Sequence, residues 1–289
     1  MNDIILTDKQ IAKVKELAGK TRKEMGVYAD VSIADDLFTL LEMKGIIVCE
    51  YPFADEAHIE AYITIFNNYG DELVFVGLNS NLYYDEQIFA LAHELYHYQT
   101  KTGMAFQTNN CEEDEVTERM ADRYSAELLL PIDELKGSIK KTFRGQDINE
   151  ISELRMLRFV ARLQVQWWLP YRSIIKRMFE EGGLSEDRRD ALLNIDCRSE
   201  NGQYAKILKS IDPDKFLLLN NKSGKLSISN SIMEIVIRNF EDGYISEDEF
   251  IKVLALFDKK PCDFGFDTSA ILDDEDLREF TKDNKSDEG

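Results

Sequence analysis

The sequence has few histidines, few basic residues relative to acidic ones, and no long apolar run. Its 289 residues include 3 His, 35 Lys or Arg and 55 Asp or Glu, for a formal net charge of -20. A broad nucleic-acid-binding surface needs concentrated Lys and Arg, so direct nucleic-acid binding is not expected, although a small basic patch is still allowed. No apolar stretch reaches the length that a bilayer span requires, so no membrane segment is expected either.

Paired cysteines and a targeting signal are also missing. The four cysteines are scattered and form no CxxC pair, which argues against a redox motif or a zinc ribbon. The first twenty residues carry early charges and lack the apolar run and cleavage site of a signal peptide. We therefore expect a cytoplasmic protein with reduced thiols. A hydrophobic content of 44% is enough to bury a substantial core.

Local patterns predict helices, then a small sheet, then more helices. The expected N-terminal elements are a helix from an N-cap at Thr7 to about Lys23, a helix from near Ser32 to Gly45, a strand over 46–53, a hairpin of two strands around the turn "NNYGDE", a helix starting at Asp85, and a helix from about Asp114 to Leu130. Helical patterns dominate beyond Pro131. A small hairpin is expected around Asn220 to Gly224, and Ser246 with Glu249 forms a capping box.

Two of the three histidines lie in the segment "FALAHELYHYQT". His93 and His97 are four residues apart, so on a helix they project from one face and can hold one metal ion. Glu94 lies about 100° round the helix, where it can reach a water molecule without ligating the metal. This H-E-x-x-H pattern is typical of zinc proteases, in which Glu94 would act as the general base. The alternative is a helix whose histidines are ordinary core or surface residues.

A third ligand is expected downstream, because catalytic zinc sites keep three protein ligands and one open position. No histidine follows His97, so this ligand must be a carboxylate or a thiolate. Glu118 and Asp122 are four apart on the next predicted helix, the arrangement of thermolysin-like zincins, with Glu118 as ligand and Asp122 supporting a histidine. Glu115 is a substitute candidate for the ligand and Cys111 a weaker one. The competing interpretation is a solvated acidic helix start.

The two motifs together resemble those of the ImmA/IrrE family of metallopeptidases. "FALAHELYHY" is similar to that family's active-site helix, "ERMADRYSAELLLP" to its second motif, and "LVFVGLNSNL" to the strand and turn before the helix. The resemblance covers roughly residues 30 to 135. It implies His93, His97 and Glu118 as Zn²⁺ ligands and Glu94 as catalytic base. Tyr96 departs from the family by standing where Gly is frequent, and Ser125 by standing where Ala is common.

The resemblance also implies a function. Family members are typically cytoplasmic, bacterial or phage-encoded proteins that cleave one partner, often a helix-turn-helix repressor of a mobile element or stress response. We therefore expect a zinc endopeptidase acting on a DNA-binding repressor. The alternative is a non-proteolytic zinc-containing regulatory protein that sequesters a partner. Manganese or iron would also suit His and carboxylate ligands.

The expected fold class is α+β. A zincin-like domain with a small sheet packed on helices is expected over 1–135, a mainly helical recognition or regulatory region over 136–266, and an acidic, flexible tail over 267–289.

Three further features leave alternatives open. The strand "ELVFVGLN" is either a sheet edge that could bind an extended substrate or an inner strand. The oxyanion donor could be Tyr96, Tyr98, Tyr124 or His58. The segment from Arg144 to Arg177 is basic and loosely resembles half a helix-turn-helix; we expect its arginines to pair with acidic residues rather than bind DNA, and Trp167 and Trp168 to lie in the core.

Overall fold

The computed structural model describes residues 5–54, 59–68, 71–102 and 111–266. Contacts divide the chain into two compact units, Met1–Lys225 and Leu226–Gly289. The boundary expected near residue 135 lies inside the first unit, and the tail expected over 267–289 lies outside the described residues. Whether 1–135 forms a separate domain therefore stays a prediction.

The fold is mixed α/β and mostly helical. The first unit contains α1 (Asp8–Glu24), η1 (Ala34–Asp36), α2 (Leu37–Met43), β1 (Ile46–Tyr51), β2 (Ala61–Asn68), β3 (Asp71–Asn79), α3 (Tyr84–Thr100), α4 (Cys111–Leu129), α5 (Ile132–Phe143), α6 (Glu153–Trp167), α7 (Tyr171–Glu181), α8 (Glu186–Leu193), α9 (Gln203–Ile211) and α10 (Pro213–Leu219). The second unit contains β4 (Ser227–Ile228), α11 (Asn230–Glu241), α12 (Glu247–Leu256) and η3 (Pro261–Phe264). None of the helices in the described part of the chain is both long and apolar enough to span a bilayer.

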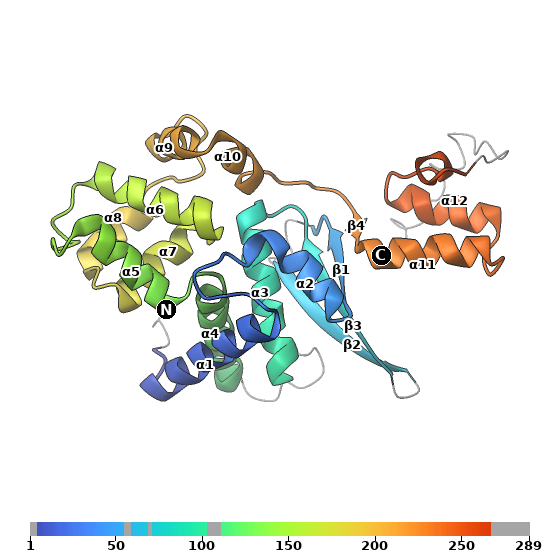
Figure 1. Cartoon of the computed structure of the whole chain (residues 1–289), viewed down its shortest axis with the longest axis horizontal. Helices are drawn as coiled ribbons and strands as arrows, with labels where there is room; N and C mark the ends of the chain where they lie inside the picture. The colour runs from blue at the N-terminus through green and yellow to red at the C-terminus, as the bar shows by residue number, and fades with distance from the viewer. Residues whose placement is uncertain (1–4, 55–58, 69–70, 103–110, 267–289) are drawn as a thin grey trace. The chain divides into compact units, whose positions relative to one another are not determined.

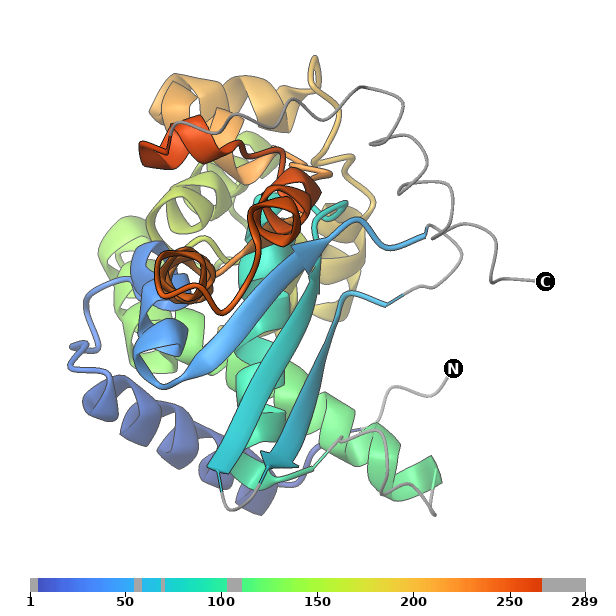
Figure 2. The same cartoon turned by 90° about the vertical axis from the view of Figure 1, so that its right-hand side faces the viewer.

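The sheet of the first unit is mixed, with β3 between β2 and β1 (Figure 2). β3 pairs antiparallel with β2, as the turn chemistry predicts, and parallel with β1. The strand "ELVFVGLN" is therefore an inner strand, and β2 pairs with no strand other than β3 among the described residues.

One face of this sheet is covered by α3, and α4 packs alongside α3 (Figures 1 and 2). Alternate residues of β2 and β3, such as Ile63, Val74 and Val76, are buried, and so are Leu91 and Leu95 of α3. Burying such side chains stabilises the fold by roughly 1.5–3 kcal/mol each. This packing holds α3 rigidly against the sheet.

Most expected elements have counterparts at the expected places. Thr7 caps α1 through a capping box with Gln10, and Ser246 caps α12 through one with Glu249. Trp167 and Trp168 are buried, as expected. The hairpin expected around Asn220 to Gly224 is wrong: residues up to Leu219 form α10.

The helix α10 begins where two local signals coincide. The Asp212 side chain accepts a hydrogen bond from the Lys215 N–H, and Pro213 occupies the first helical turn. Phe216 and Leu219, three residues apart, are both buried on one side of the helix. The apolar run that resembled a strand therefore forms a short helix, which buries Phe216 and Leu219 and leaves Leu217 and Leu218 exposed.

Candidate metal centre

The two histidines of the H-E-x-x-H motif lie on one face of α3, and the structure brings Glu118 of α4 to them. His93 Nε2 is 2.9 Å from Glu118 Oε2, and His97 Nε2 is 3.3 Å from Glu118 Oε1. The two Nε2 atoms are 3.1 Å apart. The ligand atoms of His93, His97 and Glu118 all lie within 4.8 Å of one another, so the three side chains could hold a metal ion.

The donor set fits a small divalent cation. Tetrahedral zinc with bonds of about 2.0–2.2 Å separates its ligand atoms by about 3.3–3.5 Å, close to the three separations given above. Two imidazole nitrogens and one carboxylate suit Zn²⁺ and also Mn²⁺ or Fe²⁺. The arrangement therefore supports a metal centre without selecting the metal.

Each histidine has a partner at its other ring nitrogen. His93 Nδ1 is 3.3 Å from Asp122 Oδ1, and His97 Nδ1 is 3.3 Å from Thr102 Oγ1. When Nδ1–H donates to these oxygens, the lone pair of each histidine is placed on Nε2, which faces the shared centre. The support expected from Asp122 is thus present in the geometry.

Thr102 was not identified from the sequence. Lys101 ends α3 in the left-handed conformation, with φ of 55°, and turns the chain back so that Thr102 N–H donates to His97 O over 3.2 Å. The Thr102 hydroxyl also lies 2.6 Å from Thr100 Oγ1. No local sequence signal indicates this contact, because a non-glycine residue at a left-handed C-cap is uncommon.

The electrostatics of the cluster are dominated by carboxylates. Burial acts to lower the pKa of His93, but hydrogen bonds to Asp122 and Glu118 outweigh it and raise the pKa to about 10. In turn, hydrogen bonds from His93 and His97 hold the pKa of Glu118 well below its usual range. The site therefore concentrates negative charge that favours a bound cation.

Glu94 lies beside the histidines but outside the ligand cluster. Its side chain is buried, and burial raises its pKa against the opposing charges of His93 and His97. Glu60, immediately before β2, is a further carboxylate near the site that the sequence did not reveal. Desolvation, with the charges of Glu86 and Asp122, raises the pKa of Glu60, and the charge of His93 opposes that rise.

The alternative residues are placed as follows. Glu115 is exposed and not part of the cluster, and the side chain of Cys111 lies outside what the structure describes.

Among the candidate oxyanion donors, Tyr124 is buried and donates its hydroxyl to Thr21 Oγ1. Tyr96 is buried, with its ring 5.5 Å from that of Tyr124 and 5.7 Å from that of His97. Both tyrosines thus belong to the core, Tyr98 is half-buried beneath Lys101, and His58 lies outside the described residues.

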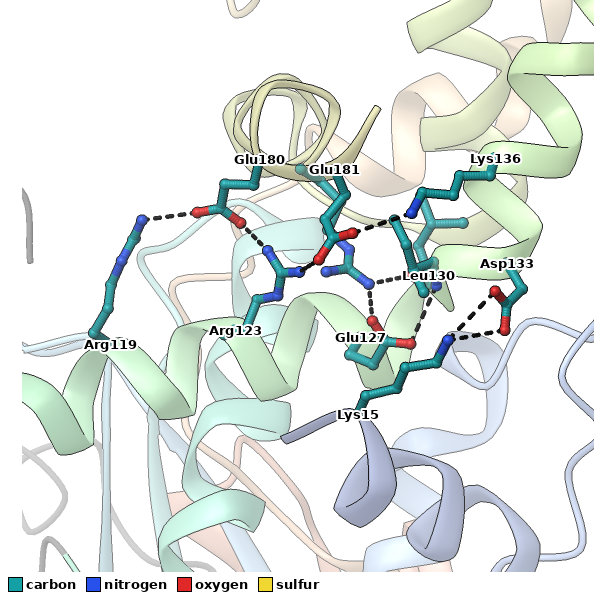
Figure 3. Close-up of polar contacts among 11 residues, drawn as sticks. Lys15, Arg119, Arg123, Glu127, Leu130, Asp133, Lys136, Glu180 and Glu181 are labelled. Carbon is teal, nitrogen blue, oxygen red and sulfur yellow. Dashed lines mark hydrogen bonds and ion pairs between the residues drawn. The ribbon is translucent and has the colours of Figure 1, made fainter. Parts of the chain in front are cut away.

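The side of α4 next to the one that carries Glu118 and Asp122 is held by ion pairs to α7 (Figure 3). Arg119 donates to Glu180 over 2.8 Å, and Arg123 pairs with both Glu180 and Glu181. One turn further along α4, Glu127 pairs with Arg177 of α7. These ion pairs recur once per turn along α4, the helix that carries Glu118 and Asp122. They therefore fix the orientation of α4 about its own axis, with Glu118 and Asp122 facing the histidines.

The expected pairing of basic residues in 144–177 is only partly found. Arg177 pairs with Glu127, and Lys176 lies 4.0 Å from Asp122. Among the described residues, no ion pair is formed by Arg144, Arg155, Arg158, Arg162 or Arg172. For those five arginines, the expected pairing with acidic residues is not found within the described part of the chain.

No family model matches the chain, and neither does any curated protein or solved structure. The resemblance to ImmA/IrrE metallopeptidases thus rests on the residues and spacings of the two motifs.

Proposed function

We propose that the chain is a metal-dependent endopeptidase of the ImmA/IrrE type, with zinc as its cofactor and a zincin-like arrangement of the sheet, α3 and α4. The observation that carries this proposal is the convergence of His93 Nε2, His97 Nε2 and the Glu118 carboxylate, with Glu94 buried beside them. A structural metal site has no need of an adjacent buried carboxylate that does not ligate. A hydrolytic site does need one as a general base.

In this proposal His93, His97 and Glu118 hold the metal. When bound, a zinc ion would lower the pKa of a water molecule and polarise the scissile carbonyl. Glu94 takes the proton of the attacking water and passes it to the leaving nitrogen. Asp122 and Thr102 keep the two imidazole rings oriented through their Nδ1 atoms.

Substrate would bind as an extended segment. β2 packs on α3 and pairs only with β3 among the described residues, so its other edge could accept a further strand. Tyr62 and Phe66 of β2 are each more than half exposed and offer apolar contacts beside that edge. The substrate class implied by the family resemblance is a helix-turn-helix repressor in the cytoplasm.

The test is the intact mass of a candidate helix-turn-helix repressor after co-expression with this chain. We expect two fragments with the native chain and none with Glu94→Gln, because the amide cannot accept the proton of water. Metal content should be unchanged in Glu94→Gln, since the residue is not a ligand. A repressor that stays intact but co-purifies would favour the sequestering alternative, and cleavage by Glu94→Gln would refute the mechanism.

A further inference from the structure

A cleft of 810 Å³ lies between α5 and α6 and shares no residue with the metal centre. Its size is within the range of small-molecule sites, which is roughly 300–1,000 Å³. The two helices and their connection line it with four cationic side chains, those of Lys141, Arg144, Arg155 and Arg162. No acidic residue of the described part of the chain lines it.

This charge pattern is unusual for the chain. The whole sequence carries a net charge of -20, yet the described residues that line this cleft include four positive side chains and no negative one. Lys141, Arg144 and Arg162 have neither an ion pair nor a side-chain hydrogen bond among the described residues. Like charges that line one cleft repel one another, and an anion bound between them would relieve that repulsion.

Arg155 is the cation that the protein orients. Its NH1 group donates to Gln146 Oε1 over 2.7 Å, and its guanidinium lies 5.6 Å from the ring centroid of Phe143. Its NH2 and Nε groups have no protein partner among the described residues. Phe143 and Phe159 are buried beneath the cleft with ring centroids 4.9 Å apart, so its floor is rigid and apolar.

We propose that this cleft binds a nucleotide-sized ligand that carries two or more phosphate groups. Guanidinium groups bind phosphate oxygens through paired, charge-assisted hydrogen bonds, and three arginines with one lysine provide for more than one phosphate. The apolar floor and the amide side chains of Gln146 and Gln166 suit the base and sugar of such a ligand. A nucleic-acid duplex is a poorer fit, because the strongly acidic chain would repel a long phosphate backbone outside the cleft.

The test is calorimetric titration of the full chain with ATP, inorganic pyrophosphate and a short single-stranded oligonucleotide. We expect ATP to bind best, and the double variant Arg144→Gln/Arg162→Gln to weaken it at least tenfold. The matched control is Arg158→Gln. Arg158 lies one turn from Arg162 on α6 and is also exposed and unpaired among the described residues, but it does not line the cleft. Its substitution should change the affinity less than twofold.

Three results would overturn the proposal. Absence of binding to either phosphate compound at millimolar concentration would remove the ligand class. Equal weakening by Arg158→Gln would indicate general charge attraction in place of a site. Tighter binding of the oligonucleotide than of ATP, with a steep salt dependence, would assign the cleft to nucleic acid. Unchanged thermal unfolding of the variants excludes misfolding as the cause, and none of these readouts depends on peptidase activity.

Discussion

At the scale of single residues, the metal centre depends on which side of a carboxylate-rich helix faces α3. α4 begins with several acidic residues, and spacing alone leaves both Glu115 and Glu118 as candidate ligands. In the folded chain the Glu118 carboxylate reaches both histidines, whereas Glu115 is not part of their cluster. Glu115 and Glu118 are three residues apart, which is nearly one turn, so they lie on similar sides of α4. Glu115, however, lies nearer the N-terminus of the helix.

These two residues form a matched pair for a test of the ligand assignment. Glu118→Gln should lower the affinity for Zn²⁺ by at least about 100-fold, because one of three ligands loses its charge. Glu115→Gln removes the same charge on the same helix and should leave the affinity unchanged. Competition with a chromophoric chelator measures both. Loss of zinc binding in the Glu115 variant alone would move the third ligand to that residue.

At the scale of helices, α4 is fixed from two sides. The side that carries Glu118 meets α3, and the adjoining side, one residue further round the helix, carries the ion pairs to α7 (Figure 3). The pair between Arg177 and Glu127 is buried, with the Arg177 side chain 0% exposed. Burial and the nearby charge of Arg123 lower the pKa of Arg177 to about 9. A buried pair of this kind stabilises the fold only while both partners are present.

Replacing one partner should therefore be costly. Arg177→Met leaves the Glu127 carboxylate buried without its cation, and we expect a loss of roughly 3–5 kcal/mol in the free energy of unfolding. Adding Glu127→Gln should recover much of that loss. In the native chain Glu127 Oε1 accepts a hydrogen bond from the Ile132 N–H over 3.1 Å, and the amide oxygen of Gln can accept the same bond. Urea denaturation measures each variant.

The control for this experiment is an exposed ion pair. Lys15 and Asp133 lie 3.1 Å apart with side chains 49% and 78% exposed. Lys15→Gln should cost less than about 1 kcal/mol, as exposed pairs do. If Arg177→Met were equally mild, the α4–α7 contacts would not be what holds α4 in place.

The short elements show where local patterns suffice and where they do not. The capping box at Thr7 and the antiparallel pairing of β2 with β3 are predicted correctly, because both depend on residues that are close together in the sequence. The segment before Asn220 was misread because an apolar run of this length suits a strand or a buried helix equally. Packing on α9 and α3 decides in favour of a helix.

At the scale of the whole molecule, a buried polar network ties the start of α3 to later helices. The Asp85 carboxylate accepts from Gln164 Nε2 of α6 and from Arg198 NH2, both over 2.7 Å. Tyr204 of α9 donates to Gln164 Oε1 over 2.7 Å. Burial raises the pKa of Asp85 to about 6, against the opposing effect of Arg198.

This shift predicts a pH dependence of stability. An acid whose pKa is higher in the folded than in the unfolded chain contributes most below the unfolded pKa of about 4, and that contribution is lost as pH rises to about 6. The native chain should therefore lose up to about 3 kcal/mol relative to Asp85→Asn between pH 4 and pH 7. Denaturation of both chains across this range measures the difference. A constant difference would show that Asp85 titrates as it does in the unfolded chain.

The division into two units predicts where the chain can be cut. A fragment of residues 1–225 keeps every described contact of the metal centre and of the α4–α7 pairs, and should fold and bind one Zn²⁺. A fragment of residues 1–135 loses α7 and leaves Glu127 buried or newly exposed without Arg177, so it should not fold stably. Circular dichroism and metal content test both fragments. A stable, zinc-binding 1–135 fragment would restore the boundary expected from the sequence.

The sequence by itself determined the candidate ligands on α3, because four-residue spacing on a helix places two side chains on one face whatever surrounds them. It also indicated Glu118 and Asp122, since they share one face of a second helix. Only the tertiary structure decided which carboxylate meets the histidines, which oxygen supports His97, and which arginines line the cleft between α5 and α6. Those outcomes depend on contacts between segments far apart in the chain, whose distances no local pattern encodes.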